Sequence, residues 1–109
     1  MKQSTEYINL LERLNNKTAL IAVIGMGYVG LPLALSYAEA NYKVLGIDID
    51  KNKVKKINNS ESYINHISSE KIKNLVNQNT LQATTSFSEV KNADAIILCL
   101  PTPLNKYRE

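Results

Sequence analysis

Three glycines at positions 25, 27 and 30 constrain the fold of this chain more than any other feature. They follow the apolar run Leu20–Ile24, whose isoleucines and valine are typical of a buried parallel strand, and they precede residues 33–40, which favour a helix. A G-x-G-x-x-G spacing between a strand and a helix is typical of dinucleotide-binding folds. We therefore expect Gly25 to allow the turn off the strand, Gly27 to let a pyrophosphate approach the backbone, and Gly30 to let the helix pack close to the sheet.

A second apolar run, Tyr42–Ile47, ends directly before Asp48. In dinucleotide-binding folds an acidic residue at this place accepts hydrogen bonds from the ribose hydroxyls of the adenosine and repels a 2′-phosphate. The sequence thus predicts NAD as the cofactor. Asp50 is interpreted as the cap of the next helix. The alternative is that it helps Asp48 to exclude a 2′-phosphate. An acid here also suits the ribose of S-adenosylmethionine in a methyltransferase-like domain, but the pyrophosphate-type glycine spacing argues against that alternative.

The hydrophobic periodicity predicts alternating strands and helices along the rest of the chain. The expected strands cover Leu20–Ile24, Tyr42–Ile47, Leu81–Thr85 and the apolar run Ala93–Leu100. The expected helices are an amphipathic helix over residues 4–16, one over Gly30–Ala40, one over Lys51–Ile57, and one that begins at Ser68–Glu70 and has Ile72, Leu75 and Val76 on one face. A capping box at Ser86–Glu89 is expected to open a further helix of one to two turns. Right-handed crossovers place the strands in the order 3-2-1-4. The predicted fold class is α/β, a Rossmann-type doubly wound parallel sheet truncated after about four strands.

The length of 109 residues corresponds to one small domain. We expect residues 1–17 to form an N-terminal amphipathic helix outside the minimal nucleotide fold, and residues 18–109 to form the nucleotide-binding domain. A doubly wound sheet normally adds further strands beside the fourth one, which would otherwise be an exposed apolar edge. We therefore expect the chain to be the N-terminal part of a longer protein.

The charge and the cysteine content exclude several classes of function. The net charge of +3 comes from 13 basic and 10 acidic residues, and the bases are mostly scattered lysines, which argues against a nucleic-acid partner. The sequence has no apolar run near the ~20 residues that span a bilayer, and its polar start has no signal-peptide core. The single cysteine forms no internal disulfide. These observations predict a cytoplasmic protein without a membrane partner.

Three polar residues outside the glycine motif are interpreted as structural. Cys99 lies in the apolar fourth strand and is expected to pack as a small hydrophobic residue, so no catalytic residue is assigned in this chain. His66 is the only histidine, and the absence of Cys/His ligand spacing predicts no metal site. Asp94 is expected in a surface turn.

Four segments of the chain are similar to one enzyme family. They are Ile24–Pro32 (I-G-M-G-Y-V-G-L-P), Gly46–Asp50 with the following Lys53-Val54, Ser62–Ile67, and Leu100–Leu104. From about Lys17 onward the chain resembles the opening of the UDP-glucose/GDP-mannose dehydrogenase family. The last two segments are most similar to the bacterial UDP-N-acetylglucosamine 6-dehydrogenases, which make uronic acid precursors of surface polysaccharides.

The resemblance implies an NAD-dependent oxidoreductase that oxidises the primary alcohol of a UDP-sugar to a carboxylate in two NAD-linked steps, through a thioester on a cysteine. The family's catalytic cysteine and lysine belong to segments beyond residue 109, so we expect no turnover by this segment alone. The family's central dimerising segment implies a homo-oligomer. The alternative is a stand-alone NAD-binding regulatory module without chemistry.

The resemblance also assigns cofactor-binding residues by motif position. Lys53 corresponds to a basic residue near the adenosine ribose, although a solvated helix lysine is an equally good interpretation of the sequence. The other implied contacts are the pyrophosphate cradle of Gly27, Tyr28 and Val29, the ribose acceptor Asp48, and the strand-end turn of Leu100, Pro101 and Thr102 beneath the cofactor.

Overall fold

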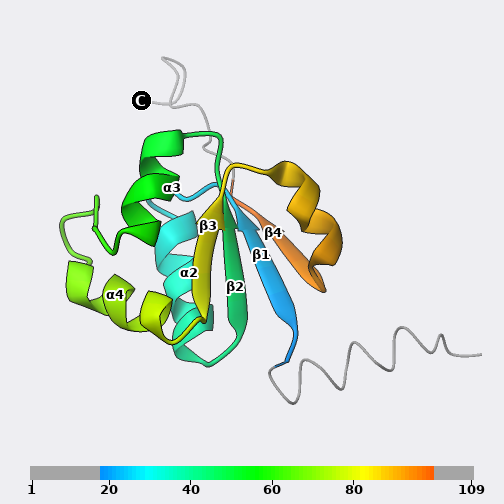
Figure 1. Cartoon of the computed structure of the whole chain (residues 1–109), viewed down its shortest axis with the longest axis horizontal. Helices are drawn as coiled ribbons and strands as arrows, with labels where there is room; N and C mark the ends of the chain where they lie inside the picture. Colours follow the sequence, from blue (N-terminus) through cyan, green and yellow to red (C-terminus); the bar gives the residue numbers. More distant parts are fainter. Residues whose placement is uncertain (1–17, 100–109) are drawn as a thin grey trace, which may run out of the picture.

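The computed structural model describes residues 18–99, which form a parallel sheet with helices packed against it (Figure 1). The strands are β1 (Leu20–Ile24), β2 (Lys43–Ile47), β3 (Leu81–Thr84) and β4 (Ala95–Leu98). The helices are α2 (Gly30–Glu39), α3 (Lys51–Asn58), α4 (Ser69–Asn77) and the 3₁₀ helix η1 (Phe87–Asn92). The helix predicted over residues 4–16 lies outside the described residues.

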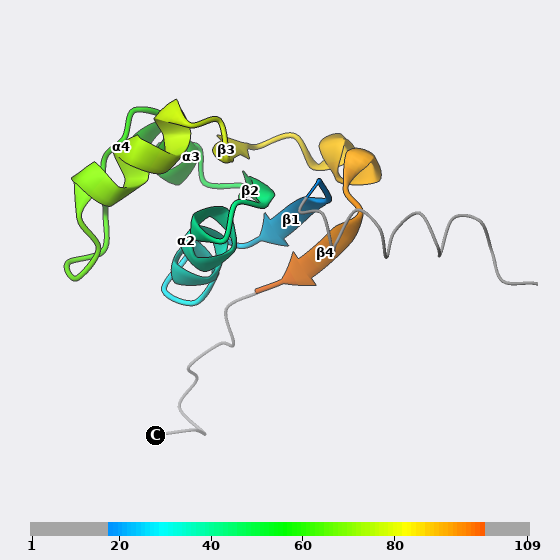
Figure 2. The ribbon, with the colours of Figure 1, turned by 90° about the horizontal axis from the view of Figure 1, so that it is seen from below.

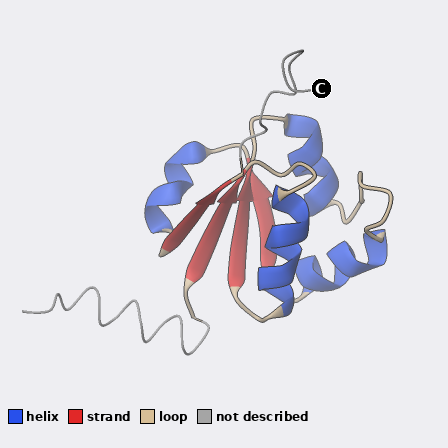
Figure 3. Ribbon diagram, turned by 180° about the vertical axis from the view of Figure 1, so that it is seen from behind, coloured by secondary structure: helices blue, strands red, loops and turns tan. Residues whose placement is uncertain are grey.

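The strands are arranged in the order β3-β2-β1-β4, which confirms the predicted topology and the α/β fold class. The sheet is flanked by α2, α3 and α4 on one face and by η1 on the other (Figures 2 and 3). The register pairs Ile24 at the end of β1 with Ile47 of β2 and with Leu98 of β4. The carboxyl ends of the three strands therefore reach the same edge of the sheet, where ligands bind in this kind of fold.

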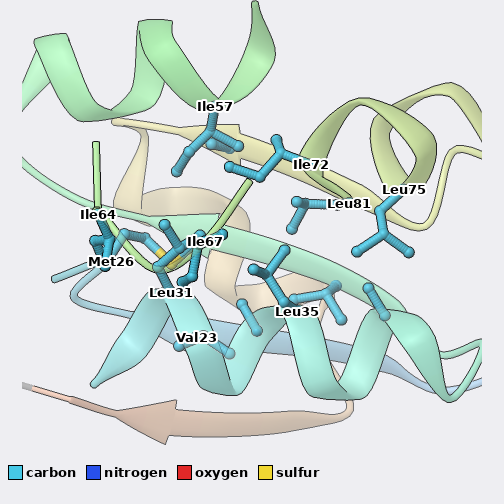
Figure 4. Packing of buried hydrophobic residues seen from close by; sticks show 14 of the residues in the cluster. Val23, Met26, Leu31, Leu35, Ile57, Ile64, Ile67, Ile72, Leu75 and Leu81 are labelled. Atoms are coloured by element: carbon cyan, nitrogen blue, oxygen red, sulfur yellow. The ribbon is translucent and has the colours of Figure 1, made fainter. Parts of the chain in front are cut away.

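The main hydrophobic core lies between the sheet and the three α-helices (Figure 4). Its largest fully buried members come from every layer: Val23, Met26, Leu31, Leu35, Ile57, Ile72 and Leu81. Burial of each such side chain stabilises the fold by roughly 1.5–3 kcal/mol. A smaller cluster of Ala22, Ile24, Leu45 and Ile47 lies on the opposite face, where Val90 and Ala93 pack against it. Both faces of the central strands are thus buried, in agreement with their continuous apolar sequences.

The edge strand β3 is protected by a side chain of α3. The Asn58 amide donates to the Ala83 carbonyl at 2.9 Å and accepts from the Ala83 N–H at 3.0 Å. The side chain therefore satisfies both backbone groups of Ala83, as a neighbouring strand would.

The capping box predicted at Ser86–Glu89 is wrong. The Ser86 side chain makes no capping hydrogen bond, and its hydroxyl instead lies 3.0 Å from the Ser88 hydroxyl. The Glu89 N–H bonds the Ser86 carbonyl at 3.3 Å, three residues back, so the segment winds as a 3₁₀ helix rather than as the start of an α-helix.

The fourth strand is shorter than predicted and lies at the edge of the described sheet. Ala93 closes η1 by donating to the Val90 carbonyl at 3.0 Å, so β4 begins only at Ala95. Asp94 is half-buried rather than a free turn residue, because its carboxylate accepts from the Leu20 N–H at 2.9 Å. Among residues 18–99, no helix is long and apolar enough to cross a membrane.

Candidate functional site

A cleft opens where β1 and β2 end. Its volume is about 350 Å³, and its walls come from the strand ends, the start of α3 and η1. The lining residues are Ile24, Gly25, Ile47, Asp48, Ile49, Asp50, Lys53 and Phe87. The cleft lies over the ends of β1 and β2, and β1 also forms one side of the point where the strand order reverses, between β1 and β4.

The three glycines of the motif have different surroundings. Gly25 has a φ of +96° and its N–H donates to the Ile47 carbonyl at 2.7 Å, which makes the tight turn off β1. A Cβ on Gly25 would overlap the Cys99 carbonyl, and a Cβ on Gly30 would overlap the Gly25 carbonyl. A Cβ on Gly27 would meet only the Lys53 ammonium at 3.9 Å. Gly25 and Gly30 are therefore required by the fold, whereas Gly27 leaves open space above the loop.

The start of α2 carries free donors. Within the described part of the chain, the backbone N–H groups of Gly27, Tyr28 and Val29 have no hydrogen-bond partner. The side chains of Tyr28 and Val29 are mostly exposed. Unpaired N–H groups and the partial positive charge of a helix N-terminus together favour binding of a phosphate group.

The Asp48 carboxylate lies between the glycine loop and the start of α3. One oxygen accepts from the Met26 N–H at 2.8 Å, and the other accepts from the Asp50 N–H at 2.9 Å. An ionised carboxylate has about four acceptor positions, so each oxygen retains capacity for a further donor such as a ribose hydroxyl. The sequence predicted Asp48 as a ribose acceptor but not its bond to Met26, because no local pattern links residues 26 and 48.

Asp50 caps α3, as predicted. One of its oxygens accepts from the N–H groups of Asn52 and Lys53, at 2.9 Å and 3.4 Å. The cap fixes the first turn of α3 next to the cleft. Lys53 lines the cleft and also a second depression of about 290 Å³ beside Tyr28. Its ammonium lies close to the glycine loop, 3.9 Å from the position that a Cβ on Gly27 would take.

Tyr63 is part of the site but was not found by sequence reasoning about function. Its hydroxyl donates to the Met26 carbonyl at 2.5 Å. Burial raises the pKa of the Tyr63 phenol well above its ordinary value, and the negative charges of Asp48 and Asp50 raise it further. The phenol is therefore neutral and remains a hydrogen-bond donor at physiological pH.

The remaining predicted residues are placed as follows. Cys99 is a half-buried free cysteine that packs against the main core. His66 is exposed in the connection between α3 and α4. Residues 18–99 contain no group of three or more His, Cys, Asp or Glu side chains that would hold a metal ion. Leu100, Pro101 and Thr102 lie outside the described residues.

Known proteins are similar to this chain in sequence and in fold. The model of the UDP-glucose/GDP-mannose dehydrogenase family, NAD binding domain, matches residues 19–109. Protein CapL of Staphylococcus aureus is 36% identical over 82% of this chain and 20% of its own length. UDP-N-acetyl-D-mannosamine dehydrogenase of Pyrococcus horikoshii is 35% identical over 78% of this chain and 21% of its own. The solved structure of NDP-N-acetyl-D-galactosaminuronic acid dehydrogenase from Methanosarcina mazei aligns with a TM-score of 0.75 and 31% identity, over 95% of this chain and 23% of that one.

The fold and the loop geometry define a dinucleotide-binding α/β domain. The chain belongs to the UDP-glucose/GDP-mannose dehydrogenase family, whose NAD-binding domain it matches, and the family's cofactor is NAD. The chain spans about a fifth of the length of the curated relatives described above.

Proposed function

We propose that this chain is the NAD-binding segment of an oxidoreductase that converts UDP-N-acetylglucosamine, or a related UDP-sugar, to its uronic acid in two NAD-linked oxidations. The product would be a precursor of surface polysaccharides. Two of the relatives above are named for N-acetylated sugars, which supports a 2-acetamido sugar as the substrate. Because those relatives are several times longer, the activity and the homo-oligomeric assembly would belong to a longer protein, with residues 18–109 as its NAD domain and residues 1–17 as a separate N-terminal helix.

The observation that carries the proposal is the open space at Gly27 beside unpaired backbone donors. The N–H groups of Gly27, Tyr28 and Val29 would bind the diphosphate. The free acceptor positions of Asp48 would bind the adenosine ribose hydroxyls and exclude a 2′-phosphate.

Three further positions and Lys53 complete the proposed cofactor site. The Lys53 ammonium would add a positive charge between the ribose and the diphosphate, since it lines both depressions at the loop. Leu100, Pro101 and Thr102 would form the turn beneath the cofactor, directly after β4.

The chemistry would be divided between the cofactor and the protein. Bound NAD⁺ supplies a hydride acceptor. The residues of this chain bind and orient it, and none is assigned a role in bond making or breaking. The glycine loop and Asp48 thus determine which dinucleotide binds, while the sugar specificity resides elsewhere.

The experiment is a turnover assay on the longer protein that contains this domain. NADH formation would be measured with UDP-N-acetylglucosamine, UDP-N-acetylmannosamine and UDP-glucose. The proposal predicts two NADH per molecule of an N-acetylated UDP-sugar and little from UDP-glucose. Exclusive turnover of UDP-glucose would refute the substrate assignment. Binding of NAD⁺ without turnover of any sugar would favour the stand-alone regulatory module.

A further inference from the structure

The backbone of Met26 is held on both sides, directly before the free donors of the glycine loop. Its N–H donates to Asp48 at the end of β2, at 2.8 Å. Its carbonyl accepts from the Tyr63 hydroxyl, 37 positions further along the chain, at 2.5 Å. The loop is therefore connected to two distant segments at the residue that precedes Gly27.

The segment that carries Tyr63 is itself anchored. The Ser62 hydroxyl lies 2.9 Å from the Ile64 carbonyl and 3.2 Å from the Ile64 N–H, which fixes the backbone on both sides of Tyr63. Ile64 and Ile67 are buried in the main core, in the same cluster as the Met26 side chain (Figure 4). The Tyr63 hydroxyl thus belongs to a rigid support.

The Tyr63 bond also affects the start of α2. A helix continued backward by one turn would pair the Gly30 N–H with the Met26 carbonyl. That pair is not formed within the described residues, and the carbonyl accepts from Tyr63 instead. The Gly30 N–H consequently has no partner in the described residues, and it lies next to the unpaired N–H groups of residues 27–29.

We propose that Tyr63 is a positioning residue for the dinucleotide, whose hydroxyl holds the Met26 carbonyl and so keeps the loop donors in the conformation that binds the diphosphate. The inference rests on the proposed NAD site. A loop that is ordered before the ligand arrives loses less conformational entropy on binding, so the bond raises affinity without touching the ligand. The Tyr63 hydroxyl would therefore strengthen binding of the diphosphate and leave binding of the adenosine unchanged.

The test compares Tyr63→Phe with Tyr37→Phe in calorimetric titrations. The Tyr37 hydroxyl makes no hydrogen bond within the described residues, so it controls for loss of a phenol oxygen. Phenylalanine retains the ring, which keeps the packing at both positions. We expect Tyr63→Phe to bind NAD⁺ and ADP-ribose roughly 3- to 10-fold more weakly, the equivalent of one net hydrogen bond. Adenosine affinity should change less than about twofold, and Tyr37→Phe should match the wild type.

Two results would overturn the proposal. One is unchanged NAD⁺ affinity in Tyr63→Phe, and the other is an equal loss for adenosine, which would show that Tyr63 acts through Asp48. Amide hydrogen exchange of the unliganded protein gives an independent readout, because the Met26 N–H should exchange severalfold faster in Tyr63→Phe. If the wild type binds no NAD⁺, the proposed function fails, and the Met26 exchange rate still decides whether Tyr63 holds the loop.

Discussion

Replacing Gly30 by alanine is expected to destabilise the domain, although alanine favours helices. A Cβ there would overlap the Gly25 carbonyl and lie 3.5 Å from the Cys99 Cβ. The carbonyl is not free to move, because the Met26 N–H in the same peptide plane is bonded to Asp48 at 2.8 Å. Alanine gains about 1 kcal/mol over glycine within a helix, whereas overpacking against a fixed group costs about 3 kcal/mol. We therefore expect the free energy of unfolding to fall by about 2 kcal/mol.

Gly27→Ala is the matched control from the same loop. Its Cβ would have only the Lys53 ammonium nearby, at 3.9 Å, so we expect the stability to change by less than about 0.5 kcal/mol. The same Cβ would occupy the space proposed for the diphosphate, so the NAD⁺ affinity should fall at least about tenfold. Urea unfolding with an unchanged m value measures the first effect, and calorimetry measures the second. A stable Gly30→Ala, or an equal loss of stability in Gly27→Ala, would refute this division of roles.

Three further predictions concern neighbouring elements. Asn58→Ala should lower the free energy of unfolding, measured in urea, by about 1–3 kcal/mol, because the N–H and the carbonyl of Ala83 both lose their partners. Asn77→Ala is the control and should lose almost no stability, because Asn77 is likewise the last residue of its helix, α4, and its side chain makes no hydrogen bond in the described residues. The pKa of Tyr63 is raised in the folded state, so the contribution of its hydroxyl to the free energy of unfolding is complete below the ordinary phenol pKa of about 10 and decreases as the pH rises above that value. The difference in the free energy of unfolding between wild type and Tyr63→Phe should therefore shrink above that pH, as measured by urea unfolding. Lys53→Met should weaken NAD⁺ binding severalfold and reduce its salt dependence in calorimetry, whereas the exposed Lys55→Met on the same helix should change neither.

The boundaries of the central strands were predictable because local chemistry marks them. β1 ends directly before Gly25, which takes a positive φ, and β2 ends directly before Asp48, whose carboxylate accepts from the glycine loop. β4 was predicted too long because the apolar composition of residues 93–100 does not reveal the hydrogen bond that closes η1 at Ala93. The 3₁₀ winding was missed for a similar reason, since S-x-x-E also occurs where the serine side chain bonds elsewhere.

The structural roles of Gly25 and Gly30 were predictable because a fixed spacing carries them. The hydrogen bond of Tyr63 was not predictable, because its hydroxyl donates to the Met26 carbonyl, 37 positions away, and no sequence periodicity indicates such a contact. The bond from the Met26 N–H to Asp48 could not be predicted for the same reason, because the two residues are 22 positions apart. Residues that support a site from another segment are fixed by the tertiary fold and leave no local pattern.

Calorimetric titration of the protein with NAD⁺ and NADP⁺, repeated on Asp48→Asn, tests the central claim most directly. The account predicts saturable binding of one NAD⁺, with NADP⁺ bound at least about tenfold more weakly because the carboxylate repels the 2′-phosphate. Asp48→Asn should narrow that difference, since the amide carries no charge. A folded protein that binds neither dinucleotide, or binds both equally, would contradict the assignment of the glycine loop and Asp48 as the NAD site.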